Sequence, residues 1–115
     1  METASLFKAL SDTTRLRCVV LLARRGELCV CELTHILALP QPKVSHHLAA
    51  LRKAGLVDHR KEGLWIYYRI REDLPPWVAD VISAATQGTG NDPLFAADTA
   101  SLGEIANRPE DLCCA

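Results

Sequence analysis

The chain has 115 residues, of which 49% are hydrophobic and 23% are charged, and its formal net charge is −1. This size and composition are typical of one globular domain with a single modest core. No run approaches the roughly 18 apolar residues that a membrane span requires, and the N-terminus lacks a secretion signal, so we expect a cytoplasmic protein that does not bind membranes. In a reducing compartment, five cysteines are expected to be thiols or metal ligands rather than a disulfide framework.

The charges are strongly segregated along the chain. Residues 41–71 hold seven basic and two acidic residues, whereas residues 72–115 hold one basic and eight acidic residues. A block this basic in an otherwise acidic protein indicates a polyanion contact. The alternative is a solvated charged face, and the structural elements within the block decide between the two.

Three helices are predicted before the basic block. The first carries a short apolar stripe, and the second begins after a cap at Ser11 or Asp12 and ends at Gly26. The third runs from about Val30 to Ala38, and a proline-containing turn over residues 39–42 ends it.

The fourth predicted helix, "QPKVSHHLAALRKAG", ends at Gly55 and is the most informative element for nucleic acid. One face carries an apolar stripe, and the opposite face is short-chained, polar and basic, as suits a helix lying close to base edges in a major groove. Two short helices joined by a tight turn, the second with such a face, predict a helix-turn-helix. The residues expected to contact DNA from this element are Gln41, Lys43, Ser45, His46, His47 and Lys53.

The next segment, "LVDHRKEGLWIYYRI", changes from a helical to an alternating pattern of apolar residues. The alternation over residues 65–70 and the glycine-containing turn over residues 61–64 predict a β-hairpin. A basic hairpin directly after a helix-turn-helix indicates a winged helix, with Arg60 and Lys61 near the tip and able to reach phosphates.

A fifth helix is predicted to open at Pro75 and Pro76. Residues 86–93, "TQGTGNDP", are typical of a flexible break, and the capping-box spacing of "SLGE" at residues 101–104 predicts a short final helix to about Asn107. We therefore expect a winged-helix domain over residues 1–85 and a flexible acidic tail over residues 86–115.

Four segments in order resemble a known family: "LFKALSDTTRLRCVVLL", "GELCVCEL", "QPKVSHHLAALRKAGLV" and "GLWIYYRI". They are similar to the ArsR/SmtB metal-responsive winged-helix repressors, and more narrowly to the arsenic-responsive branch, over about residues 5–85. The resemblance implies a mainly α fold with a small β-hairpin, and a homodimer that binds operator DNA and lets go when arsenite or an organoarsenical binds its cysteines. The first and fifth helices would pack against the partner through Leu6, Phe7, Leu10, Trp77, Val81 and Ile82.

The cysteine motif departs from the usual Cys-x-Cys-x-x-Cys of arsenic repressors, because Thr34 replaces the third thiol after Cys29 and Cys31. As(III) prefers soft thiolates, and a helix N-terminus favours the thiolate form. Residues i and i+2 of a regular helix point about 200° apart, so both sulfurs can face one ion only if the first turn unwinds. Such unwinding next to the fourth predicted helix, which carries the expected DNA contacts, would lower the affinity of the protein for DNA.

The third ligand stays open at this stage. Cys113 or Cys114 could complete a three-thiolate site on its own subunit or on its partner, or two thiols could suffice for a mono-organoarsenical. The alternative for the terminal pair is an unstructured end that binds nothing. Cys18 is expected to be a packing residue.

Other functions remain alternatives. The two cysteines of the motif could simply be small semi-buried residues at a helix entry. They, or the vicinal terminal pair, could form a thiol redox switch, or the chain could be a Zn(II)- or Cd(II)-responsive repressor of the same superfamily. A helix-turn-helix protein that only assembles with partners would keep the fold and ignore arsenite. An enzyme is not expected, because no nucleophile and base fall in a recognisable catalytic spacing.

Overall fold

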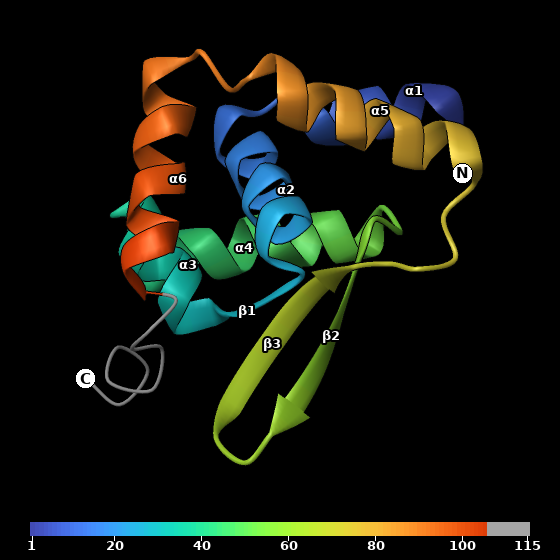
Figure 1. The fold of residues 1–115 in the computed structure, drawn as a ribbon. Helices are drawn as coiled ribbons and strands as arrows, with labels where there is room; N and C mark the ends of the chain where they lie inside the picture. Colours follow the sequence, from blue (N-terminus) through green and yellow to red (C-terminus); the bar gives the residue numbers. More distant parts are fainter. Residues whose placement is uncertain (106–115) are drawn as a thin grey trace.

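The computed structural model describes residues 1–105 as a mainly helical fold with one small sheet (Figure 1). The helices are α1 (Thr3–Leu10), α2 (Thr13–Arg25), α3 (Val30–Leu37), α4 (Gln41–Lys53), α5 (Pro76–Gly88) and α6 (Pro93–Ile105); the strands are β1 (Glu27–Cys29), β2 (Val57–Glu62) and β3 (Trp65–Ile70). The predicted winged helix-turn-helix is confirmed. None of the described helices is long and apolar enough to cross a membrane.

Capping contacts and backbone conformation set the ends of the helices that precede α4. The Asp12 carboxylate caps α2 by accepting a hydrogen bond from the Arg15 backbone N–H at 3.0 Å. Helix α2 ends at Gly26, whose φ of +97° is a backbone conformation that side chains disfavour. Helix α3 ends at Ala38 in the left-handed region, with φ +54°. These two sharp stops orient α3 against α4.

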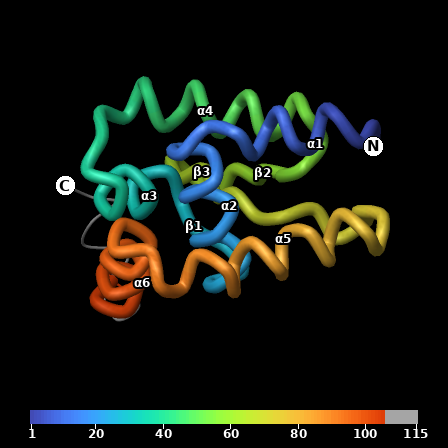
Figure 2. The backbone as a smooth tube through the Cα atoms, turned by 90° about the horizontal axis from the view of Figure 1, so that it is seen from above, coloured from blue at the N-terminus to red at the C-terminus, as the bar shows by residue number. Residues whose placement is uncertain are grey.

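Helix α2 lies at the centre of the fold. Seen from above, α1 and α4 run along one side of it and α5 along the other, while α3 and α6 close one end (Figure 2). Residues 18–22 of α2 are all buried, which is possible because neighbours cover the helix on more than one side. The core that they share with α4 and the sheet is almost entirely aliphatic, as the low aromatic content requires.

The sheet has three strands in the order β1-β3-β2, all antiparallel. The hairpin of β2 and β3 is the predicted wing, with Glu62 opposite Trp65 at its tip. Strand β1 is an addition to the predicted topology, and its central residue Leu28 lies opposite Tyr68. Three residues are too few to show an alternating pattern, so the sequence carried no signal for this strand.

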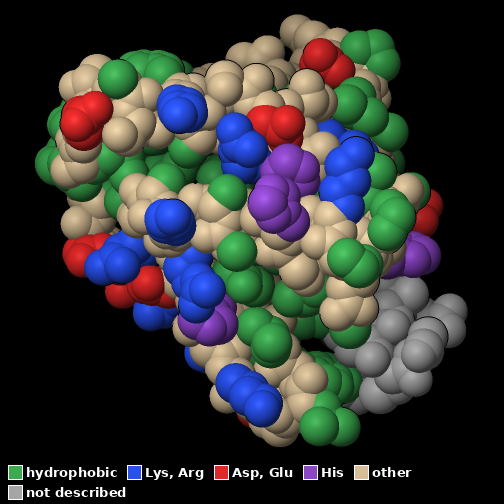
Figure 3. All heavy atoms as spheres, turned by 180° about the vertical axis from the view of Figure 1, so that it is seen from behind, with side chains coloured by type: hydrophobic (Ala, Val, Ile, Leu, Met, Phe, Trp, Pro, Cys, Tyr) green, Lys and Arg blue, Asp and Glu red, His purple; other side chains and the backbone are tan. Residues whose placement is uncertain are grey.

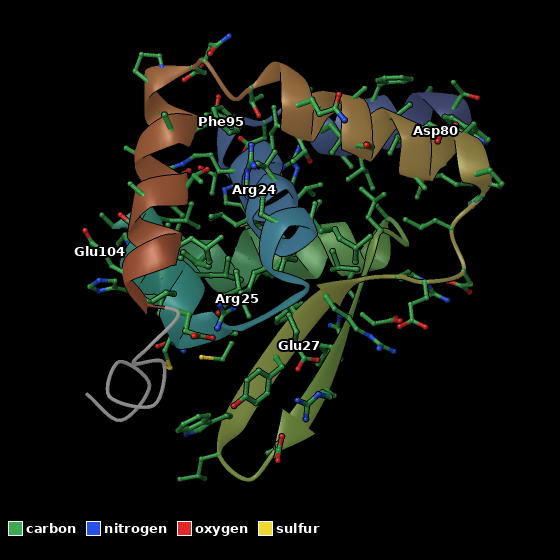
Figure 4. The ribbon with its side chains drawn as sticks, in the orientation of Figure 1. Arg24, Arg25, Glu27, Asp80, Phe95 and Glu104 are labelled. Atoms are coloured by element: carbon green, nitrogen blue, oxygen red, sulfur yellow. The ribbon has the colours of Figure 1, made fainter. Side chains whose placement is uncertain are left out.

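The C-terminal part of the described chain differs from the predicted flexible tail. Helix α5 continues to Gly88, and α6 occupies residues 93–105, starting well before the predicted capping box. Helix α6 packs on α2 and α3, with Phe95, Leu102 and Ile105 buried (Figures 1 and 4). The carboxylate of Asp98, 4% exposed, interrupts this apolar stripe. That interruption is why the periodicity was missed.

A buried ion pair attaches α6 to α2. The Arg17 guanidinium donates through Nε and Nη2 to the two carboxylate oxygens of Asp98, each at 2.8 Å. Both side chains are largely buried, and the pair raises the pKa of Arg17 through its hydrogen bonds to Asp98. A bidentate pair of this kind fixes direction as well as distance.

Removing one half of this pair should destabilise the fold strongly. We expect Asp98→Asn to lower the free energy of unfolding by about 3–5 kcal/mol, because the Arg17 cation then stays buried without a carboxylate. Urea unfolding followed by circular dichroism measures the change. The double variant Arg17→Met with Asp98→Leu is the control and should recover most of the loss. A cost below about 1 kcal/mol for Asp98→Asn, typical of exposed pairs, would contradict this account.

Candidate nucleic-acid interface and cysteine site

Helix α4 has the two faces that its sequence predicts. Its apolar stripe is fully buried against the core, and α3 packs beside it to complete the helix-turn-helix. Gln41, Lys43, His46 and Lys53 are exposed, and Ser45 is half-buried. Proline residues flank Gln41, and no side chain caps this helix start. The outward face is therefore open, short-chained and cationic, as a major-groove contact requires.

His47 lies beneath that face, contrary to its predicted contact with DNA. Its side chain is 12% exposed, and its Nδ1 lies 3.7 Å from a carboxylate oxygen of Asp12, which is too long for a hydrogen bond. Burial lowers the pKa of His47; Asp12 opposes this shift, whereas Arg15, His46 and Lys43 add to it. A neutral His47 thus packs between α4 and the start of α2.

The two faces of the wing have different chemistry because successive strand residues point to opposite sides. His59 stacks on its cross-strand partner Tyr68, with 5.5 Å between ring centroids, and lies 3.2 Å from a guanidinium nitrogen of Arg52 on α4. This face is therefore directed toward α4, and Lys61, two residues after His59, shares it. Sequence reasoning missed Arg52, although it lies in the basic block beside Lys53.

Arg60 occupies the other face of the wing, so the structure does not place it where a phosphate contact was predicted. Its guanidinium donates two hydrogen bonds to Glu27, at 2.6 and 2.9 Å, and one to Glu62 at 2.6 Å. It also lies over the ring of Tyr67, 4.5 Å from the centroid. The hydrogen bonds to Glu27 and Glu62 raise the pKa of Arg60. The positive charge of Arg60 is thus paired with two carboxylates of the same chain.

Further cations flank the recognition helix. A hollow of about 430 Å³ lies between α1, α2 and α4 and is lined by Lys8, Arg15 and Lys53 among small side chains, without an acidic residue in its described lining. Lys, Arg and His side chains gather on the face of the molecule opposite to that of Figure 1 (Figure 3). Lys8 and Arg15 lie outside the basic block of the sequence, so only the fold brings them beside α4.

The two cysteines of the motif lie at the junction of β1 and α3. Cys29 ends the strand and is the N-terminal cap residue of α3, with 1% of its surface exposed, while Cys31 is half-buried in the first helical turn. The buried Glu32 carboxylate accepts a hydrogen bond from the Cys29 backbone N–H at 2.9 Å. Opening this turn would therefore break a buried capping contact.

The described residues alone do not assemble a complete metal site. Within residues 1–105, no group of three His, Cys, Asp or Glu side chains is placed to hold an ion. Thr34, at the position of the missing thiol, has a buried hydroxyl without a hydrogen-bond partner in this part of the chain. Cys113 and Cys114 lie outside the described residues. Burial raises the pKa of the Cys18 thiol to about 12, so this residue is a packing thiol.

The residues expected at a dimer interface divide into two groups. Phe7 on α1 and Trp77 on α5 are 52% and 38% exposed, respectively. Leu10 and Val81 are partly buried and pack against the core of the protomer. Leu6 and Ile82 lie inside that core and are not available to a partner, since neighbouring side chains of the same chain cover them.

Comparisons with known proteins agree with this architecture. The model of the family described as bacterial regulatory protein, arsR family, matches residues 12–59. The arsenic resistance transcriptional regulator ArsR1 of Pseudomonas putida is 46% identical over 105 residues, which cover 91% of this chain and 80% of that protein. The arsenical resistance operon repressor of Escherichia coli is 51% identical over 80 residues, or 70% of this chain and 68% of that protein. The structure of HlyU from Vibrio cholerae matches with a TM-score of 0.66 and 34% identity, over 76% of this chain and 96% of that one.

The two faces of the wing predict opposite results for their cations. Lys61→Gln should weaken binding to duplex DNA and reduce the slope of log K against log salt by about 0.9, the value for one lost phosphate contact. Arg69→Gln removes the same charge from the opposite face of the wing, where Arg69 donates a hydrogen bond to Glu72, so it should leave the slope within error of the wild type. Fluorescence anisotropy over a range of salt concentrations measures both slopes. Equal slope changes in the two variants would contradict the assignment of faces.

The pKa shift of His47 predicts a pH dependence of stability. Its folded pKa lies below the unfolded value near 6.5, so the unfolded chain binds more protons and stability falls as pH drops through that range. We expect the wild type to lose more unfolding free energy than His47→Gln between pH 7.5 and 5.5, two values within the histidine range of about 5 to 8. Urea titrations at the two pH values measure this loss. The exposed His35→Gln should behave like the wild type, and equal losses in both variants would refute the buried-neutral assignment.

Proposed function

Because this chain belongs to the arsR family of bacterial regulatory proteins, we propose that it is an arsenic-responsive repressor that binds operator DNA as a homodimer. Trivalent arsenic, as arsenite or an organoarsenical, binds cysteine thiolates and releases the protein from the operator. The observation that carries this proposal is the placement of Cys29 and Cys31 at the start of the helix that supports α4. The family consists of regulators.

The operator contact uses the open face of α4 for bases and the surrounding cations for phosphates. Gln41, Lys43 and His46 project from the exposed first half of α4, where side chains can reach base edges. Lys53 on α4 and Lys61 on the wing face directed toward α4 suit phosphate contacts, with Arg52, His59 and the hollow lined by Lys8 and Arg15 nearby. This division supports sequence-specific binding with a strong salt dependence.

The homodimer would form through α1 and α5. Both helices flank α2 at the surface, and each exposes a large aromatic side chain, Phe7 on α1 and Trp77 on α5 (Figure 2). Exposed aromatic residues of this kind are typical anchors of protein interfaces. Leu10 and Val81 would lie at the edge of the contact. Two copies related by a two-fold axis would present two α4 helices to a palindromic operator.

In the reduced protein, the inducer site consists of Cys29, Cys31 and one thiol of the terminal pair. Ile105, the last residue that the structure describes, belongs to the same core as Val30 of α3. Cys113 lies eight positions after Ile105, and an extended segment of that length would span roughly 26–29 Å. This reach is about twice the length of α3, roughly 12 Å for eight residues, so a terminal thiol can reach the first turn. Three thiolates suit the softness of As(III).

Binding of the ion competes with the regular start of α3. Two thiolates at positions i and i+2 face one ion only if the turn opens, and opening it breaks the capping contact between Glu32 and the Cys29 backbone. Helix α3 packs on α4, so loss of its first turn removes support from the DNA-binding face. The ion therefore stabilises the form of the protein with low affinity for DNA.

The thiolate set predicts which variants lose induction. We expect Cys31→Ser, Cys29→Ser and a truncation lacking residues 112–115 each to keep operator affinity within about threefold and to lose release by arsenite, because each lacks one thiolate. Operator release is measured by fluorescence anisotropy with a duplex selected from a random library. Cys18→Ala is the matched control and should release normally, since its thiol is buried and protonated.

Further arms of the titration separate the alternatives. Thr34→Cys in the truncated chain restores the Cys-x-Cys-x-x-Cys spacing and should recover release. Normal release by Cys31→Ser would refute the site, and normal release by the truncation would show that two thiols suffice. Release of the wild type by Zn(II), Cd(II) or peroxide, but not by arsenite or methylarsenite, would replace the arsenic proposal by a metal or redox sensor.

A further inference from the structure

The sheet places the cysteine junction and the wing in one row of residues. Cys29 lies opposite Tyr67 on β3, and Tyr67 lies opposite Arg60 on β2. Directly opposed residues of an antiparallel sheet share a face, and Glu27, two residues before Cys29, shares it as well. A continuous line of side chains therefore leads from the cap of α3 to the wing.

One ion pair spans this row from edge to edge. Strands β1 and β2 are not neighbours, yet the Glu27 carboxylate on β1 accepts two hydrogen bonds from Arg60 on β2 across the ring of Tyr67. Figure 4 shows Glu27 against the wing on the side that faces the viewer. The second partner of Arg60, Glu62, belongs to β2 itself and connects the wing to nothing else. Within the described chain, Glu27 is thus the anionic partner of Arg60 that lies outside the hairpin.

We propose that Glu27 is the positioning residue that couples ligand binding at the cysteines to the orientation of the wing. This inference rests on the proposed function. A ligand that opens the junction at Cys29 displaces β1, which has three residues, and with it the carboxylate that holds Arg60. The wing then loses its only described side-chain ion pair to β1.

The consequence reaches DNA through Lys61. Lys61 follows Arg60 on the same strand and points to the opposite face, which is directed toward α4. The angle of the wing decides whether Lys61 meets a phosphate while α4 lies in the groove. Opening the cysteine junction would therefore weaken two parts of the DNA contact at once, α4 through α3 and the wing through Glu27.

The test compares two isosteric changes on the two carboxylates that bind Arg60. The release ratio is the operator Kd with arsenite divided by the Kd without it. Glu27→Gln should lower this ratio at least about twofold, within the range known for residues that modulate coupling between sites. Glu62→Gln removes the same charge from the same arginine and should leave the ratio unchanged. Arg60→Gln should repeat the effect of Glu27→Gln, and the double variant Glu27→Gln with Arg60→Gln should add nothing further.

A second measurement follows the wing without DNA. The chain has two tryptophans, and Trp65 lies on β3 of the wing, 6.1 Å from the Tyr67 ring between centroids. In a Trp77→Phe background, arsenite should change the Trp65 emission, and adding Glu27→Gln should abolish that change. Absorbance of the arsenic–thiolate bonds should show unchanged arsenite binding in the same variants.

The outcomes separate the two proposals. A wild type that arsenite does not release would overturn the proposed function and this coupling with it. Wild-type release with equal ratios in Glu27→Gln and Glu62→Gln would overturn the coupling alone. Loss of arsenite binding in Glu27→Gln would also overturn it, because the residue would then belong to the ligand site.

Discussion

The burial of α2 is the constraint on which the rest of the structure depends. Its residues 18–22 are shielded by other helices and by the sheet, so α2 orients α1 and α5 on its flanks, α4 below and α6 at its end. The polar contacts of α2 are placed at positions where that burial is incomplete. Asp12 caps its start beside His47, and Arg17 holds Asp98 of α6. Because α2 is rigid and central, it fixes the DNA-binding face and the proposed dimer face relative to each other.

The junction of β1 and α3 is small compared with this rigid centre, and it contacts two other parts of the fold. Its helix packs on α4, and its strand pairs with β3 of the wing. A ligand bound at the junction contacts few residues. Even so, α4 and the wing, the two parts proposed to contact DNA, each pack directly against the junction. Opening the junction disrupts one helical turn and one capping contact, which are a small part of the fold. The small size of the disrupted region makes the junction a suitable place for a sensor.

The sequence predicted the elements whose periodicity is long enough to detect. The apolar stripe of α4 identifies the buried face of that helix, and the alternation over residues 65–70 identifies strand β3; both predictions are confirmed. The features that the sequence did not predict concern partners distant in the chain. Charge sign alone assigned Arg60 to phosphate, whereas the sheet register pairs it with Glu27, 33 positions away. Only the end of helix α6 was predicted, and its first two turns were missed because the buried face includes Asp98, whose partner Arg17 lies 81 positions away. A local sequence pattern carries no information about side chains that pair over such distances along the chain.

The same reasoning explains why charge is a poor guide to the interface of this protein until the fold is known. Lys8 and Arg15 come from a segment of balanced charge and still line the hollow beside α4, whereas Arg60 comes from the most basic block and is neutralised within the chain. Counterion release depends on cations that can approach a phosphate, and a guanidinium already bound by two carboxylates releases few ions. The electrostatic surface that DNA meets is therefore set by packing and register as much as by composition. Under the two proposals, the sheet register also decides which wing residue would contact DNA and which would respond to ligand binding at the cysteines.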